Sequence, residues 1–300
     1  MRQLTDWERI KLLEHTAETI NPDWLVLYGQ IIEDRALPAA LKAYFLRIDE
    51  QPLDREYVAS VRELVLAREK LMLTVNLAYR DRLLALFSDL DTYTIPANAS
   101  PRYGIDDRLL KQVLLDLITV DDSPESHQLI LDHFRRATMA NDRVAALLAL
   151  NRSSSPARRP LMEEVYKNWV GHLSGYANYL RVVSSGTCDD VFDRIAQERS
   201  RPTFDVNIPT WSRALFLPMA ANNKMVWTDR GIQWLVATVI ELAPVNATTT
   251  SRLLNTFQHV NRLKPELRQK VTASLERILQ EVSETASPTI YGQARAYLGR

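Results

Sequence analysis

Glycine and cysteine are the two residue types that this sequence uses sparingly. Eight glycines occur in 300 residues, less than half of the usual ~7%. Glycine supplies most backbone positions with φ > 0, so this scarcity argues against glycine-rich nucleotide-binding loops, β-barrels and jelly rolls. Cys188 is the single cysteine, which excludes an internal disulfide and a zinc cluster built from cysteines.

An excess of charge of either sign is also absent. The 37 Lys and Arg residues balance the 37 Asp and Glu residues, so the chain has no global field to attract nucleic acid or an anionic membrane. No uncharged apolar stretch approaches the ~20 residues of a membrane span. The first residues, MRQLTDWER, contain no apolar signal core. We therefore expect a cytoplasmic protein with neither nucleic acid nor membrane among its partners.

Apolar residues recur with the period of an α-helix along nearly the whole chain. Leu110, Val113, Leu114 and Leu117 fall at positions i, i+3, i+4 and i+7, which places them on one face of a helix. Three further stripes follow helical steps: Leu41, Tyr44, Phe45 and Ile48; Ile232, Leu235, Val236, Val239 and Ile240; and Leu263, Leu267, Val271, Leu275 and Leu279. Sustained strand-like alternation is hard to find, so the expected fold class is all-α.

Proline and aspartate mark where several of these helices are expected to begin. Pro38, Pro124 and Pro209 suit the first turn of a helix, where the missing N–H costs nothing. Asp229 stands where an N-cap side chain would accept a backbone hydrogen bond. The sequence therefore predicts many short helices joined mostly by short loops.

Many short amphipathic helices favour an α-solenoid, because a helical hairpin cannot bury its apolar stripe alone and stacks on its neighbours. The sequence has no clean period of the tetratricopeptide or ankyrin kind. We therefore predict a solenoid-like superhelix of antiparallel helix pairs, of the armadillo or HEAT type, that forms a single domain over residues 1–300. The 91–104 segment, expected to be a long loop, is the best internal boundary.

Residues arranged for catalysis or for metal binding are not evident. The zinc protease motif H-E-x-x-H needs two histidines four residues apart on one helix face. No two of the five histidines have that spacing: His15, His127, His133, His172 and His259. Adjacent carboxylates such as Asp121 and Asp122 do not face one another on a helix and make poor acid–base pairs. We expect Cys188 to be a half-buried structural thiol, and the sequence assigns no catalytic residue, metal ligand or cofactor to this chain.

Two arginines lie near the start of apolar helices. Arg213 occurs in PTWSRALFL (209–217) and Arg252 in TTTSRLL (248–254). Each side chain either extends along its helix to reach water or projects its guanidinium into a cavity, where its two-pronged geometry would bind a carboxylate. The residues alone leave both interpretations open.

The order and spacing of seven segments make nearly the whole chain resemble the C-terminal helical domain of aminopeptidase N, a zinc metallo-aminopeptidase of the gluzincin family. The segments are LTDWER (4–9), IEDRALPAALK (32–42), NDRVAALLAL (141–150), LMEEVYKNW (161–169), FDVNIPTWSRAL (204–215), SRLL (251–254) and LKPELR (263–268). The resemblance implies a helical superhelical bowl that caps the catalytic domain, encloses the active-site cavity and controls substrate access. It also implies that Arg213 and Arg252 match two cap arginines that face this cavity and hold the carboxylate end of a peptide or product.

The catalytic parts of that family are missing from this chain. Its H-E-x-x-H motif with a downstream glutamate ligand and its G-A-M-E-N exopeptidase segment belong to a preceding domain. The resemblance therefore implies that zinc resides there and that this chain is inactive alone, with the catalytic and other domains of a parent enzyme and peptide substrates as partners. The segment LFLPM (215–219) is bulkier than the resemblance predicts. The alternative is a stand-alone α-solenoid scaffold that binds other proteins.

Overall fold

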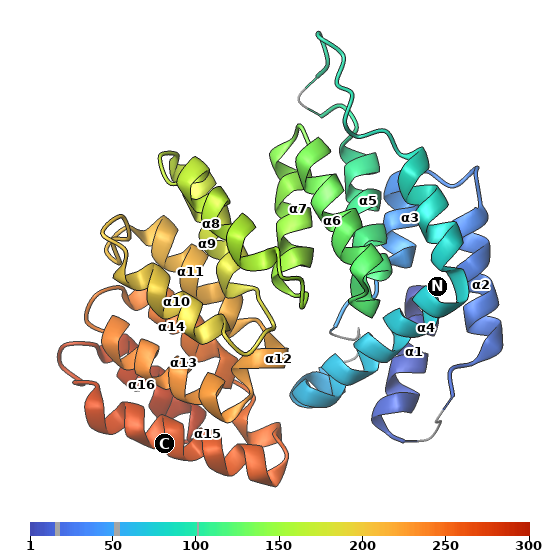
Figure 1. Ribbon diagram of the computed structural model, residues 1–300. Coiled ribbons are helices and arrows are strands. Elements are labelled where there is room, and N and C mark those ends of the chain that lie inside the picture. Colours follow the sequence, from blue (N-terminus) through green and yellow to red (C-terminus); the bar gives the residue numbers. More distant parts are fainter. Residues whose placement is uncertain (16–18, 51–54, 101) are drawn as a thin grey trace. The chain divides into compact units, whose positions relative to one another are not determined.

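The computed structural model of the protein describes residues 1–15, 19–50, 55–100 and 102–300 (Figure 1). Helices, turns and irregular loops account for all of these described residues, and none of them lies in a β-strand. The chain divides into two compact units, the first made of Met1–Arg55 and Glu63–Arg159 and the second of Glu56–Arg62 and Pro160–Arg300. The all-α fold class predicted from the sequence is confirmed.

The first unit is built around helix α5. Its helices are α1 (Arg2–Leu13), α2 (Pro22–Glu33), α3 (Ala39–Leu46), α4 (Val61–Asp89, which begins in the second unit), α5 (Ile105–Ile118), α6 (Pro124–Arg136) and α7 (Ala140–Asn151). Helix α5 packs against α3 and α7, and α6 packs against α7. The stripe predicted on α5 is confirmed, since Leu110, Val113, Leu114 and Leu117 are all buried. The 91–104 segment lies inside this unit, between α4 and α5.

The apolar stripe predicted at α3 is confirmed at Ile48, which is buried, but is wrong at Leu41 and Tyr44. Leu41 and Tyr44 are 48% and 55% exposed, and the buried face carries Lys42 and Leu46 instead. Lys42 is accommodated because its Nζ donates a hydrogen bond to the carbonyl of Ile32, near the C-terminal end of α2, at 3.0 Å. A buried ammonium that has a hydrogen-bond partner no longer prevents this face from packing inward.

The second unit stacks helices that are close in sequence (Figure 1). Its helices are α8 (Arg158–Trp169, which begins in the first unit), α9 (Leu173–Ser184), α10 (Val191–Ser200), α11 (Pro209–Ala220), α12 (Asn223–Val226), α13 (Asp229–Leu242), α14 (Ala247–Leu254), α15 (Pro265–Glu281) and α16 (Pro288–Tyr297). Helix α11 packs against α9 and α14, α13 against α14 and α15, and α16 against α14 and α15. The predicted stripes of α13 and α15 are buried in this core except at Ile240 and Leu279, which are half-buried. Such nearest-neighbour stacking is typical of α-solenoids.

Helix starts agree with the sequence to within one residue. Pro124 and Pro209 occupy the first positions of α6 and α11, as predicted, whereas Pro38 lies one residue earlier, at the N-cap of α3. The N-cap of α13 is Thr228 and not Asp229. The Thr228 backbone is extended, and its Oγ1 accepts a hydrogen bond from the backbone N–H three residues later, at 3.0 Å. Asp229 is therefore the first helical residue, where its negative charge still favours the helix N-terminus.

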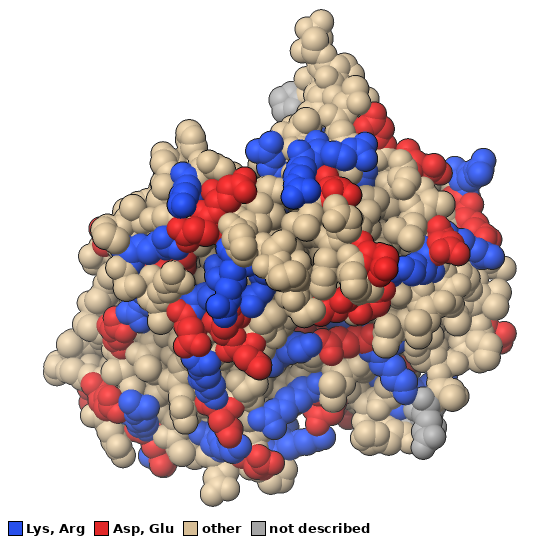
Figure 2. Space-filling model, viewed as in Figure 1, with Lys and Arg blue, Asp and Glu red and all other residues tan. Residues whose placement is uncertain are grey.

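Charges of opposite sign lie close together on the surface. Figure 2 shows Lys and Arg side chains next to Asp and Glu side chains over the visible face. Typical pairs are Arg82 with Glu33 at 2.6 Å and Lys270 with Asp229 at 2.8 Å. Over the described part of the chain, no helix combines the length and the apolar character that crossing a membrane requires.

Candidate functional site

Arg213 lies one turn into α11, with an exposed side chain. Its Nε donates a hydrogen bond to the carbonyl oxygen of Pro209 at 3.0 Å. This local bond holds the guanidinium against the first turn of the helix. Within the described residues no carboxylate forms an ion pair with Arg213, so its charge is available to a ligand.

Arg252 is exposed and lies in the last turn of α14, so the prediction that it lies near the start of a helix is wrong. Among the residues that the structure describes, it too forms no ion pair. Helix α14 packs directly against α11, and Thr256 Oγ1 donates a hydrogen bond to the carbonyl of Ala220, at the end of α11, at 3.2 Å. The structure thus brings the helices of both predicted arginines together in the second unit and leaves both guanidiniums accessible to solvent. Each exposed guanidinium has the fork geometry that can bind a carboxylate by charge-assisted hydrogen bonds.

The bulky residues that follow Arg213 fill the core of the second unit. Leu215, Phe216 and Met219 are fully buried, and the ring of Phe216 meets that of Phe204 edge-on at 6.2 Å between centroids. The large apolar side chains of α11 therefore face the interior of the second unit, whereas the side chain of Arg213 faces solvent. The apolar segment 215–219 is a packing feature of α11.

An aromatic cluster lies behind the first turn of α11. Trp211 meets Tyr176 edge-on at 5.1 Å between ring centroids, and Tyr176 stacks with Tyr179 at 6.2 Å. Tyr179 Oη donates a hydrogen bond of 2.7 Å to Oε1 of the buried Glu198. Burial raises the pKa of Glu198 and, with help from the adjacent carboxylate, that of Tyr179. These contacts anchor the start of α11, and with it Arg213, on α9 and α10.

Arg201 closes this cluster at the end of α10. It pairs with Glu163 at 2.7 Å and with Glu198 at 2.9 Å, and its guanidinium carbon lies 3.7 Å from the ring centroid of Tyr166. Burial acts to lower the pKa of Arg201, but the two carboxylates outweigh it and the pKa is raised. Because the charges of Arg201, Glu163 and Glu198 are paired with one another, we interpret this cluster as a structural support for the loop that leads into α11.

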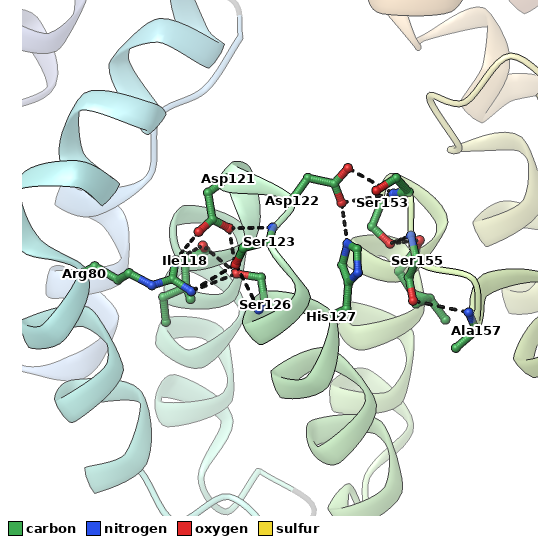
Figure 3. Close-up of polar contacts among 12 residues, drawn as sticks. Arg80, Ile118, Asp121, Asp122, Ser123, Ser126, His127, Ser153, Ser155 and Ala157 are labelled. Atoms are coloured by element: carbon green, nitrogen blue, oxygen red, sulfur yellow. Dashed lines mark hydrogen bonds and ion pairs between the residues drawn. The ribbon is translucent and has the colours of Figure 1, made fainter.

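A polar network in the first unit joins α4 to the turn between α5 and α6 (Figure 3). Arg80 pairs with Asp121 at 2.5 Å and donates to the carbonyl of Ile118 at 3.2 Å. Ser126 Oγ donates to Asp121 at 2.7 Å and accepts a hydrogen bond from Arg80 at 3.1 Å. One guanidinium therefore binds both the carboxylate of Asp121 and the carbonyl at the end of α5, which also accepts a hydrogen bond from Asn76 Nδ2 at 2.8 Å.

The carboxylate of the next residue, Asp122, has different partners. Asp122 lies 2.6 Å from Nε2 of His127 and accepts hydrogen bonds from the backbone N–H of Ser154 at 3.0 and 3.1 Å. Its pKa is lowered because the bonds from His127 and Ser154 outweigh the opposing effect of burial. Asp121 and Asp122 thus serve two separate structural contacts and do not form an acid–base pair, as the sequence indicated.

A second buried cluster holds the base of the 91–104 segment. Two cations flank the ring of Tyr93, with Lys111 Nζ at 4.1 Å and the guanidinium carbon of Arg136 at 4.2 Å from its centroid. Lys111 Nζ also donates to the carbonyl of Leu90 at 2.6 Å, and Tyr93 Oη lies 3.0 Å from Nδ1 of His133. Burial lowers the pKa of Lys111 to about 8. Burial, aided by the charges of Lys111 and Arg136, lowers the pKa of His133 to about 4.

Sequence patterns did not single out this cluster, because a lysine and a histidine at these helix positions look like surface residues until the fold encloses them. The described residues contain no group of three or more His, Cys, Asp and Glu side chains that could hold a metal ion. Cys188 is half-buried in the turn before α10.

Comparison with known proteins connects this fold to aminopeptidases. The family described as a domain of unknown function (DUF3458_C) with ARM repeats matches residues 1–291. Aminopeptidase N of Caulobacter vibrioides is 24% identical over 260 residues, which cover 84% of this chain and 29% of that protein. The crystal structure of Legionella pneumophila aminopeptidase A in complex with aspartic acid matches with a TM-score of 0.81 and 14% identity, covering 99% of this chain and 36% of that one. The chain spans about a third of the length of these two proteins.

Proposed function

The chain belongs to the DUF3458_C ARM-repeat family, the C-terminal domain of aminopeptidase N-type proteins, and on this premise we propose that it caps the active site of a zinc aminopeptidase. In this proposal it encloses the cavity in which the parent enzyme removes N-terminal amino acids from peptides. It controls which peptides enter and is not catalytic alone.

The observation that carries the proposal is a difference in length. The fold covers 99% of this chain but 36% of the solved aminopeptidase A, and the Caulobacter aminopeptidase N extends over more than three times the matched region. The catalytic machinery of such proteins then belongs to the remaining two thirds. The described residues of this chain offer no set of three metal ligands, so we assign zinc to that remaining part and derive no step through it here.

Arg213 and Arg252 are the residues of this chain that we assign to substrate. Their helices, α11 and α14, pack together, and among the described residues neither arginine has an acidic partner. A neutral chain with two unpaired guanidiniums on adjacent helices can attract the carboxylate end of a short peptide or of a product amino acid. The bond between Arg213 Nε and Pro209 restricts the arginine before substrate arrives, which reduces the entropy lost on binding.

The coding sequence that precedes this chain tests the proposal directly. An in-frame H-E-x-x-H motif with a downstream glutamate supports the cap of a zinc aminopeptidase. A start codon with no such domain before it would instead favour the alternative, a stand-alone α-solenoid scaffold.

At the bench, zinc content and hydrolysis of an alanyl-arylamide are measured for the 300-residue chain and for the parent polypeptide. We expect both in the parent and neither in the chain alone. Stoichiometric zinc with turnover by the chain alone would contradict the proposal.

A further inference from the structure

Helix α4 carries a row of exposed leucines along one side, here called the outer stripe. Leu66, Leu73 and Leu77 are 65%, 41% and 76% exposed. They are separated by seven and four residues, so at 3.6 residues per turn they lie within roughly 40° of one another around the helix axis. Leu73 and Leu77 are therefore neighbours on successive turns, and Leu66 lies two turns before Leu73 on the same side, with the exposed Lys70 between them.

The opposite side of the same helix is already fully buried. Leu64, Leu71 and Val75 have no solvent exposure, and the helical period places them about 180° from the outer stripe. The stripe is therefore not the edge of the core of the first unit. A helix that is apolar on opposite sides is typical of one that is enclosed on both sides.

Exposed apolar residues are concentrated in the first unit. Of the 13 large hydrophobic residues that are exposed in the described part of the chain, 11 belong to this unit, and Leu173 and Val245 belong to the second. The 11 are Trp7, Val26, Leu41, Tyr44, Leu66, Leu73, Leu77, Ile95, Tyr103, Ile105 and Leu109. Single exposed apolar residues are common on soluble proteins, but aligned groups of them mark interaction surfaces.

We infer that the outer stripe of α4 is the surface on which the preceding part of the same aminopeptidase polypeptide docks. This inference rests on the proposed function, because the matched proteins carry about two thirds of their length outside the region that this chain covers. That additional polypeptide supplies an occupant that is always present at high effective concentration. The stripe lies in the first unit, and Arg213 and Arg252 lie in the second. Attachment and substrate binding are thus assigned to different units.

Site-specific photo-crosslinking in the full-length parent polypeptide tests this assignment. The photoreactive residue p-benzoylphenylalanine replaces Leu73 or Leu77, the protein is irradiated, and crosslinked peptides are identified by mass spectrometry. We expect crosslinks from both positions to residues that precede this chain. The matched control is the same replacement at Leu173, an exposed leucine of the second unit, and we expect any crosslinks from Leu173 to reach peptides different from those reached from Leu73 and Leu77.

Crosslinks confined to this chain, or formed only between two copies of the polypeptide, would overturn the inference. A second measurement uses the triple variant Leu66→Gln, Leu73→Gln and Leu77→Gln in the full-length protein. We expect its Tm to fall by several degrees, whereas Leu173→Gln leaves the Tm unchanged, and equal behaviour of the two variants would also overturn the inference. A parent that hydrolyses peptides but shows no such crosslinks removes the docking surface and leaves the proposed function standing.

Discussion

The phenol ring of Tyr79 packs so closely against Gly29 that a Cβ atom at position 29 would lie 2.5 Å from Tyr79 Cζ. Both the hydroxyl group and the backbone of Tyr79 are fixed in position. Its Oη donates a hydrogen bond to the carbonyl of Leu25 at 2.8 Å, and its backbone forms the kink of α4, with φ −132° and ψ 17°. The absence of a side chain at Gly29 is therefore what allows α2 and the kinked α4 to meet.

We expect Gly29→Ala to lower the free energy of unfolding by about 1–3 kcal/mol, the usual cost of overpacking. Gly292→Ala is the matched control, because Gly292 lies in α16 and a methyl group added there would meet no described atom within 4 Å. In that open helical site alanine should stabilise the protein by about 0.5–1 kcal/mol. Urea denaturation measures both changes. Equal effects of the two substitutions would contradict the close packing at Gly29.

Arg80 should contribute far more to stability than its neighbour Arg82. Arg80→Ala removes the ion-pair partner of Asp121 and one of the donors to the Ile118 carbonyl, which keeps its hydrogen bond from Asn76 Nδ2 at 2.8 Å. We expect a loss of about 1.5–3 kcal/mol, as for hydrogen bonds to charged groups. Arg82 pairs with Glu33 on the surface, where both side chains are about half exposed, so Arg82→Ala should cost less than about 1 kcal/mol. Chemical denaturation at low and moderate salt compares the two variants, which lie on the same helix. A larger loss for Arg82→Ala would refute the role given to the network of Arg80.

His133 should make the protein sensitive to mild acid. Its pKa is lowered to about 4 in the folded chain, whereas an unfolded histidine has a pKa near 6.5. Between these values the unfolded state binds a proton that the folded state does not, so stability falls as the pH falls from about 6.5 to about 4. The full loss is about 3 kcal/mol.

The comparison of wild type with His133→Gln isolates this effect, since the variant cannot titrate there and keeps Asp142, whose pKa is raised by burial. Denaturation midpoints measured across this pH range should fall less steeply for the variant. Parallel curves, or an NMR titration that places the His133 pKa near 6.5, would show that the imidazole is not held neutral.

Arg213→Ala and Arg252→Ala should each raise KM for short peptides in the parent enzyme while zinc remains bound. The loss of a charge-assisted hydrogen bond, about 1.5–3 kcal/mol, corresponds to roughly tenfold or more in KM. Arg230→Ala is the matched control, because Arg230 is exposed but already paired with Asp193. Steady-state kinetics and zinc analysis of the three variants provide the measurement. Unchanged KM in both Arg213→Ala and Arg252→Ala would remove these residues from the substrate cavity.

Helical periodicity predicted the fold class and the buried face of α5, but not the buried face of α3. At α5 the predicted stripe and the packing partners agree, so Leu114 and its neighbours are buried as expected. At α3 the carbonyl of Ile32, in another helix, satisfies the ammonium of Lys42 and allows that lysine to turn inward. A pattern within one helix contains no information about a hydrogen-bond acceptor supplied by another.

The sequence by itself determined that the protein is helical, where α6 and α11 begin, and that Arg213 lies near the start of an apolar helix. These features depend on the backbone period, on proline and on glycine content, all of which act within a few residues. Only the tertiary structure decided that α11 and α14 pack together and that Lys111 and His133 are enclosed beside Tyr93. It also decided that one side of α4 is buried while its outer stripe is left exposed. Burial depends on contacts between residues far apart in the chain, and these exist only once the helices have packed.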